Sequence, residues 1–214
     1  PGLQRDHTVA QVLELLGRMS AAAVVLQPGF GADVDRRDIE PGLSELSCLR
    51  CIYRLADVEE SDLLFGLSEG DGSERPVSDP DTVVYLPFTS GTTGQPKGVL
   101  HTDNTLLANA RTIAADWHFS SASRIYTMSP LNHNLGFGAL ISAIAVGGEL
   151  ILHDLPKGES LLSRLRDTGT TFLFGVPTHA IDLLAELRRD GGRLPDLTGF
   201  RISGAAVPDA VCAE

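Results

Sequence analysis

Residues 89–98 hold the side chains of this chain that are best suited to binding an anion. They read Thr-Ser-Gly-Thr-Thr-Gly-Gln-Pro-Lys-Gly and directly follow an apolar, strand-like run. Glycine lets the backbone adopt positive φ and approach a ligand closely. Backbone N–H groups and hydroxyls then converge on the anion, and a lysine adds a mobile positive charge. We therefore predict a polyphosphate site with these ligands: Thr89, Ser90, Gly91, Thr92, Thr93, Gly94 and Lys97.

The segment differs from the common nucleotide-binding P-loop, which reads G-x-x-x-x-G-K-[ST]. Counted from Gly91, Pro96 stands at the second glycine position, and Gly98 follows Lys97 where a hydroxyl would ligate Mg²⁺. A plain loop rich in glycine, serine and threonine is the alternative reading. The order of hydroxyls, glycines and a lysine favours phosphate binding over that alternative.

The run 89–98, continued by Val-Leu-His-Thr at 99–102, resembles the signature loop of AMP-forming adenylating enzymes. These are acyl- and aryl-CoA ligases, nonribosomal-peptide adenylation domains and luciferases. The resemblance implies that the loop holds the β- and γ-phosphates of ATP while a carboxylate attacks the α-phosphate. It makes Lys97 a candidate catalytic residue. It also implies ATP, Mg²⁺ and CoA as cofactors, and a small carboxylic acid and a CoA or carrier-protein thiol as partners.

A second candidate segment is Pro-Leu-Asn-His-Asn-Leu-Gly at 130–136. Polar residues ahead of an apolar helix would lie at the mouth of a site near a helix N-terminus. Helix capping by Asn132 or Asn134, with His133 merely exposed, is an equal alternative. The resemblance implies that His133, Asn134 and Gly136 line the acyl pocket, and that His133 lies near the CoA channel as a second candidate catalytic residue. The His-Asn pair resembles aryl-acid-activating members in particular.

A third segment, 203–208, follows another strand and reads Ser-Gly-Ala-Ala-Val-Pro. By itself it is typical of a strand-to-helix turn with proline at the first helical position. Beside the loop at 89–98, it resembles the family segment that packs flat against adenine. The resemblance therefore implies cofactor contacts by Gly204, Ala205 and Ala206.

Repeated β-α units must position these three segments. Apolar strands alternate with helical stretches, with strands expected at 82–88, 124–128, 149–153, 171–175 and 199–202 and helices near 103–117, 134–146, 158–167 and 178–189. Asp103 is the expected N-cap of the first of these helices. The pattern predicts an α/β fold with a mostly parallel sheet covered by helices. Ligands bind beyond the carboxyl ends of such strands, which is where the three segments lie.

With the resemblance, the expected fold is a fragment of the large N-terminal domain of an adenylate-forming enzyme. We expect residues 1–81 to be an N-terminal α/β portion that ends in an acidic connecting loop, and 82–214 to be the AMP-binding core. In the first portion, a capping box at Thr8-Val-Ala-Gln11 predicts a helix start. Strands are expected at 22–26 and 49–55, with a helix or turn at 33–46.

Composition excludes several classes of function. The chain has 17 Lys and Arg against 28 Asp and Glu, a net charge of −11, and no basic stripe, which argues against nucleic-acid binding. Its most apolar stretch, 136–152, is too short and too interrupted to span a membrane. Three cysteines, including the C-x-x-C pair Cys48 and Cys51, favour a reducing compartment such as the cytoplasm. The histidine spacing does not indicate a metal site.

The leading hypothesis is ATP-dependent carboxylate activation through an acyl-adenylate, followed by thioester formation with CoA. One alternative is an aryl-acid or amino-acid adenylation enzyme that loads a carrier protein. Another is a non-catalytic nucleotide-binding module. A serine hydrolase built on Ser68 is disfavoured, because an acidic loop follows this residue instead of a helix. The family's Tyr-Gly-x-Thr-Glu segment is missing from the sequence, as is the lysine of its C-terminal domain, so we expect this chain alone to be inactive.

Overall fold

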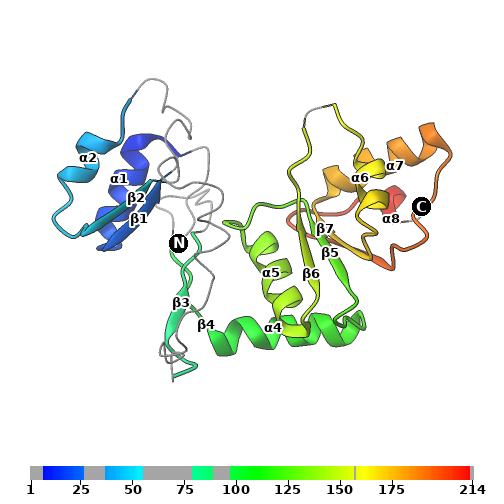
Figure 1. The fold of residues 1–214 in the computed structure, drawn as a ribbon, viewed down its shortest axis with the longest axis horizontal. Coiled ribbons are helices and arrows are strands. Elements are labelled where there is room, and N and C mark those ends of the chain that lie inside the picture. The colour runs from blue at the N-terminus through cyan, green and yellow to red at the C-terminus, as the bar shows by residue number, and fades with distance from the viewer. Residues whose placement is uncertain (1–6, 27–36, 55–78, 89–96, 157, 213–214) are drawn as a thin grey trace. The chain divides into compact units, whose positions relative to one another are not determined.

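The computed structural model describes residues 7–26, 37–54, 79–88, 97–156 and 158–212 (Figure 1). These residues fall into two compact units, one within Leu3–Ser78 and one within Asp79–Glu214. Most of the predicted phosphate loop, residues 89–96, lies outside the described residues, as does Ser68.

The unit within Leu3–Ser78 pairs two short strands beside two helices. Its elements are α1 (Val9–Arg18), β1 (Ala23–Leu26), α2 (Glu40–Ser44) and β2 (Cys51–Arg54), and β1 pairs with β2 in parallel. The predicted capping box is confirmed: the Gln11 N–H donates to Thr8 Oγ1 at 3.3 Å, and the Thr8 N–H donates to Gln11 Oε1 at 2.8 Å. Leu15, Leu16 and Leu43 form its buried apolar contacts.

The second unit is built on a four-stranded parallel sheet with the strand order β6-β5-β7-β8. Its strands are β5 (Arg124–Thr127), β6 (Glu149–Leu152), β7 (Phe172–Gly175) and β8 (Gly199–Ile202). The connecting helices are α5 (Asn134–Val146), α6 (Leu161–Asp167) and α7 (Pro177–Asp190), and α8 (Asp209–Cys212) follows β8. The α/β class with a mostly parallel sheet is therefore confirmed.

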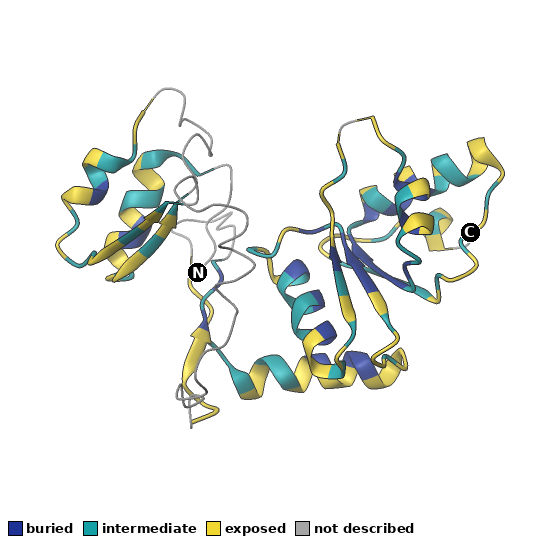
Figure 2. Ribbon diagram, viewed as in Figure 1, coloured by how far each residue is buried: buried dark blue, intermediate teal, exposed yellow. Residues whose placement is uncertain are grey.

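Helices cover both faces of this sheet because successive strand residues point to opposite sides. On one face, Tyr126, Ile151 and Leu173 pack against leucines of α6 and α7. On the other face, Ile125, Phe172, Phe174 and Leu150 pack against α5 and against α4 (Asp103–Asp116). Figure 2 shows the two central strands, β5 and β7, as the most deeply buried part of the sheet. Each fully buried Phe, Ile or Leu contributes roughly 1.5–3 kcal/mol to folding.

The strand expected at 82–88 belongs to a separate antiparallel pair. Strand β3 (Val83–Tyr85) pairs with β4 (His101–Thr102), and an isolated bridge joins Phe88 to Gly98. The chain therefore returns as a hairpin. The two ends of the predicted phosphate loop consequently lie side by side.

The N-cap of helix α4 lies one residue earlier than expected. Thr102, and not Asp103, is its N-cap: Thr102 Oγ1 accepts a hydrogen bond from the Thr105 N–H at 3.3 Å, and Thr105 Oγ1 accepts one from the Thr102 N–H at 2.9 Å. Asp103 is the first helical residue, and its negative charge there interacts favourably with the positive end of the helix dipole. Both residue types cap well, so sequence alone does not decide between these neighbours.

Candidate functional site

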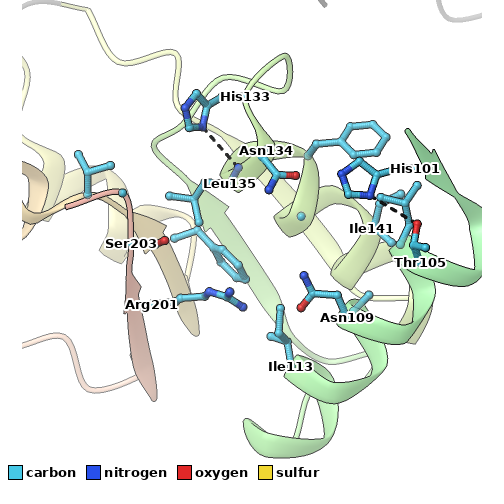
Figure 3. Close-up of a pocket in the computed structure, with 17 residues that line it drawn as sticks. His101, Thr105, Asn109, Ile113, His133, Asn134, Leu135, Ile141, Arg201 and Ser203 are labelled. Atoms are coloured by element: carbon cyan, nitrogen blue, oxygen red, sulfur yellow. Dashed lines mark hydrogen bonds between the residues drawn. The ribbon is translucent and has the colours of Figure 1, made fainter. Parts of the chain in front are cut away.

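A pocket of about 180 Å³ lies within the Asp79–Glu214 unit, at the carboxyl edge of the parallel sheet (Figure 3). Its walls come from β4 and α4, from the start of α5, and from the ends of β7 and β8. His133, Asn134, Val176, Ser203 and Gly204 all follow the carboxyl ends of strands. Of the predicted site residues, the structure thus brings His133, Asn134 and Gly204 together in one cavity.

His133 both caps helix α5 and lines the pocket. Its backbone is extended (φ −100°, ψ 142°), and its Nδ1 accepts a hydrogen bond from the Leu135 N–H at 3.5 Å. The capping alternative therefore named the wrong residues, because the cap is His133 and not Asn132 or Asn134. With Nδ1 as acceptor, the hydrogen of a neutral imidazole is on Nε2. That N–H is the donor that the ring can offer to a ligand.

Gly136 is buried and does not appear among the described residues that line the pocket. A Cβ atom at this position would collide with the carbonyl oxygens of Ser129 and Pro130. The Pro130 oxygen also accepts a hydrogen bond from the His133 N–H at 2.9 Å. Gly136 therefore lets the segment after β5 pack onto α5, and this packing places His133 at the cavity. Its contact with an acid substrate stays a prediction.

The segment after β8 contributes backbone to the pocket. Gly204 has φ of +96°, which favours glycine, and the Ser203 N–H donates to the Gly175 carbonyl oxygen at 3.1 Å. Ala205 and Ala206 are exposed and are not among the described pocket residues. Adenine contacts by Gly204, Ala205 and Ala206 stay predictions.

The structure describes only the end of the predicted phosphate loop. Lys97 is exposed and does not line the pocket, and the Val99 N–H donates to the Pro87 carbonyl oxygen at 2.9 Å. This bond and the Phe88–Gly98 bridge hold the two ends of the loop together. The other predicted phosphate ligands lie outside the described residues: Thr89, Ser90, Gly91, Thr92, Thr93 and Gly94.

Sequence reasoning missed several polar residues of the pocket, among them His101, Asn109 and Arg201. His101 Nδ1 lies 3.4 Å from Thr105 Oγ1. Asn109 interrupts the inward stripe of α4, where its neighbours Ala110 and Ile113 are buried. Arg201 lies opposite Phe174 in the β7–β8 pairing. A polar residue on an otherwise apolar helix stripe or strand face was the signal that could have identified Asn109 and Arg201.

Tyr85 of β3 lies against the pocket wall. Its ring stacks on Phe137 and on His101, two residues that line the cavity. Burial raises the pKa of the Tyr85 phenol. Its hydroxyl is buried and has no hydrogen-bond partner in the described part of the chain. The strand that leads into residues 89–98 is thereby attached to the pocket.

The pocket's donor set suits an anion better than a cation. It offers imidazole, amide, hydroxyl and guanidinium groups, and no aspartate or glutamate is among the described residues that line it. Elsewhere in the described ranges, no group of three or more His, Cys, Asp or Glu could hold a metal ion. Mg²⁺ prefers carboxylate, phosphate and water oxygens, so these residues do not fit it. Nor does any helix of the described ranges have the length and apolarity to cross a membrane.

A family model described as "AMP-binding enzyme" matches residues 3–214. The chain belongs to the AMP-binding enzyme family. It is 31% identical over 215 residues to a probable non-canonical nonribosomal peptide synthetase, CymA, of Salinispora arenicola, covering 97% of this chain and 2% of CymA. It is 26% identical over 205 residues to a 4-chlorobenzoate–CoA ligase of a Pseudomonas species, covering 94% of this chain and 37% of the ligase.

The fold of this AMP-binding family member agrees with solved structures. The N-terminal domain of FACL13 from Mycobacterium tuberculosis superposes with a TM-score of 0.78 at 18% identity, covering 96% of this chain and 50% of that one. The chain spans less than two fifths of the length of each of the two curated relatives. It therefore matches the N-terminal part of adenylate-forming enzymes.

Proposed function

We propose that the protein containing this chain activates a small carboxylic acid with ATP and then transfers the acyl group to the thiol of CoA. The observation that carries the proposal is an acid-sized pocket at the carboxyl edge of the sheet of an AMP-binding family member, with no Asp or Glu among the described residues that line it. Its volume of about 180 Å³ is below the roughly 300–1,000 Å³ typical of drug-sized ligands. A small acid suits this space.

The proposed reaction has two steps. A carboxylate oxygen of the acid attacks the α-phosphorus of ATP, the bond to the β-phosphate oxygen breaks, and pyrophosphate leaves. The thiol sulfur then attacks the acyl carbon, its proton is lost, and AMP leaves. Lys97, with the backbone N–H groups and hydroxyls of 89–94, compensates the charge that builds up on the departing pyrophosphate. Mg²⁺ would enter with ATP and neutralise part of the same charge.

His133 and Asn134 would orient the acid in this reaction. They lie where α5 begins, and a helix N-terminus favours negative charge. The Nε2–H of His133 can donate a hydrogen bond to a carboxylate oxygen. Their place in the acid pocket supports the predicted substrate contacts, and His133 also stays a candidate at the thiol-transfer step.

Transfer to a carrier-protein thiol is the second candidate for the final step. The similarity to the probable peptide synthetase CymA over 97% of this chain favours it. The similarity to 4-chlorobenzoate–CoA ligase over 94% of the chain favours CoA. The first step, carboxylate activation, is common to both candidates.

Carboxylate-dependent exchange of pyrophosphate into ATP tests the first step in the intact protein. Lys97→Ala and Thr93→Ala should each slow exchange by about a hundredfold to a thousandfold, the usual effect of losing one preorganised contact to developing charge. Arg193→Ala is the control, since it removes an exposed cation that does not line the pocket. Wild-type exchange in both loop variants would contradict the assigned role of the loop. Absence of exchange with every acid of a broad panel would favour the non-catalytic nucleotide-binding module.

A further inference from the structure

Arg201 occupies a position in β8 where the fold calls for an apolar side chain. In the β7–β8 register, Leu173 lies opposite Phe200, and Phe174 lies opposite Arg201. Leu173 and Phe200 pack on the α6–α7 side, whereas Phe174 belongs to the cluster under α4 and α5. Arg201 therefore shares the α4–α5 face. Strands of helix-covered parallel sheets are usually apolar on both faces, so a guanidinium here needs a separate explanation.

No carboxylate in the described part of the chain neutralises this guanidinium. Among the described residues, no Asp or Glu forms an ion pair with Arg201. Its guanidinium carbon lies over the Phe174 ring, 5.8 Å from the ring centroid. Other arginines of this acidic chain do have carboxylate partners at 2.7 to 3.2 Å: Arg54, Arg124, Arg164 and Arg189. A charge that is partly removed from water without an ion pair is disfavoured. The missing counter-charge can come from a ligand.

The Arg201 guanidinium points into the pocket, as Figure 3 shows. The side-chain amide of Asn109, on α4, points toward it from the facing wall. Ser203 lies two residues after Arg201 and therefore on the same side of the chain, with its hydroxyl near the cavity. Ile113 and Ile141 supply apolar wall. Two regions of the pocket thus offer donors to an anion, one around His133 and one around Arg201.

We propose that this pocket selects an acid with a second anionic group, a dicarboxylic acid, whose non-reacting carboxylate pairs with Arg201. The inference rests on the proposed carboxylate activation and names its substrate class. A guanidinium matches a carboxylate through two parallel N–H···O bonds. The Asn109 amide adds a further donor to the same carboxylate. A monocarboxylic acid of equal length would place a methyl group at Arg201 and leave the guanidinium without a counter-charge.

Direct binding to the intact protein without ATP tests this proposal by calorimetry. The probes are matched pairs: succinate with butanoate, glutarate with pentanoate, adipate with hexanoate, and isophthalate with 3-methylbenzoate. The monoamide of glutaric acid separates charge from hydrogen bonding. We expect at least one diacid to bind tenfold or more tightly than both its methyl partner and, for glutarate, its monoamide. The preference should shrink at high salt, since it is electrostatic.

Arg201→Met is the decisive variant because methionine keeps much of the length and apolar stem without the charge. It should abolish the preference for the diacid, whereas Arg201→Lys should keep part of it. Arg193→Met is the matched control, since Arg193 is exposed and does not line the pocket. Thermal melting of each variant confirms folding. If Arg201→Met does not fold, the affinities of the wild-type protein for diacid, monoamide and monoacid still test whether the pocket prefers a second carboxylate.

Three results would overturn the proposal: equal or tighter binding of the monoacids, a diacid preference that survives in Arg201→Met, or no binding of any probe. The exchange assay reports separately on the proposed function. Diacid binding without exchange would reject carboxylate activation and leave the Arg201 preference in place. Exchange that is driven best by monoacids would support activation and reject the preference.

Discussion

Tyr85 and Phe137 stack face to face, with ring centroids 3.8 Å apart and ring planes inclined by 15°. Tyr85 belongs to β3, just ahead of the predicted phosphate loop, and Phe137 belongs to α5 and lines the pocket. His101 of β4 lies on Tyr85 as well, at 5.9 Å and 28°. One aromatic stack therefore connects the ends of the loop to the wall of the pocket.

The two parts of the Tyr85 side chain should have opposite effects on stability. Tyr85→Phe removes a buried hydroxyl that lacks a partner in the described part of the chain, so it should leave the free energy of unfolding unchanged or raise it by up to ~1 kcal/mol. Tyr85→Ala removes the stacked ring and should lower it by about 3–5 kcal/mol. Urea denaturation measures both. A clear loss of stability in Tyr85→Phe would show that the hydroxyl is bonded in solution.

Two glycines of α5 provide a matched pair of substitutions. Gly136→Ala should lower the free energy of unfolding by about 1–3 kcal/mol or more, because the new Cβ meets the carbonyl oxygens of Ser129 and Pro130. Gly138→Ala has open space around it and should raise stability by ~0.5–1 kcal/mol through helix propensity. Because Gly138 lines the pocket, its variant should also bind the acid more weakly. Equal stabilities of the two variants would contradict the close packing at Gly136.

Glu186 of α7 acts as a cap for the neighbouring helix α6. Its carboxylate accepts hydrogen bonds from the Ser160 hydroxyl at 2.9 Å and from the N–H groups of Leu161 at 3.3 Å and Leu162 at 2.9 Å. Burial alone would raise the pKa of this carboxyl, but the hydrogen bonds outweigh it and lower the pKa below its ordinary value. The ionised form is thus the one that the folded state favours.

Glu186→Ala should therefore lower the free energy of unfolding by about 1–2 kcal/mol at neutral pH, as loss of a helix cap does. Because the pKa is lower in the folded state, this contribution is present above the ordinary pKa and is lost as pH falls through the folded-state value. Chemical denaturation at pH 7 and in acid measures the effect. Glu159→Gln, at an exposed carboxylate of the same connection, is the control. Wild-type stability of Glu186→Ala at pH 7 would contradict the capping role.

Two histidines, His153 and His179, should make the folded protein less stable in mild acid. Burial lowers the pKa of His153 and of His179 below the ordinary value of 6.5, so the unfolded chain binds their protons more readily. The Nδ1 of His179 also accepts the Val176 N–H at 3.2 Å, and protonation removes that acceptor. Above pH 6.5 these two histidines therefore take nothing from the free energy of unfolding. That free energy falls as pH drops below 6.5 and through the lower pKa values of the folded state.

Unfolding free energies measured between pH 5 and 7.5 check this expectation. Replacing both residues, as in His153→Gln with His179→Asn, should flatten the pH dependence in that range. His118→Asn is the control, because His118 is exposed and asparagine tolerates its positive φ of 54°. An unchanged slope in the double variant would assign the pH dependence to other groups.

The sequence predicted the central elements of the parallel sheet well. Helix α5 and strand β8 have the predicted bounds, because apolar runs and helical periodicity are strong there. The pairing of β3 was not predictable in the same way, since an apolar run does not reveal whether its partner strand is parallel. The register of β8 against β7 also required the structure, although it follows the alternation of side chains once known.

The residues of the candidate site show the same contrast between what the sequence predicts and what only the structure reveals. The segments around Lys97, His133 and Gly204 were recognisable because each is a short local motif. Asn109 and Arg201 were not, because they are far apart in the chain and are brought together only in the folded pocket, which α4 and β8 both line. The N-cap of α5 is His133, and only the backbone geometry of the structure identified it among the residues after β5.

The place of β8 in the order β6-β5-β7-β8 has a consequence for protein engineering. Within the described sheet β8 is a border strand, hydrogen-bonded along one side, whereas the side chains of β5 and β7 fill the interior. Replacing residue 201 therefore disturbs fewer neighbours than replacing Ile125 or Phe172. If the proposed pairing of Arg201 with an acid holds, acid preference and fold maintenance reside in different strands, and randomising this one position is a sound first library for changing the preferred acid.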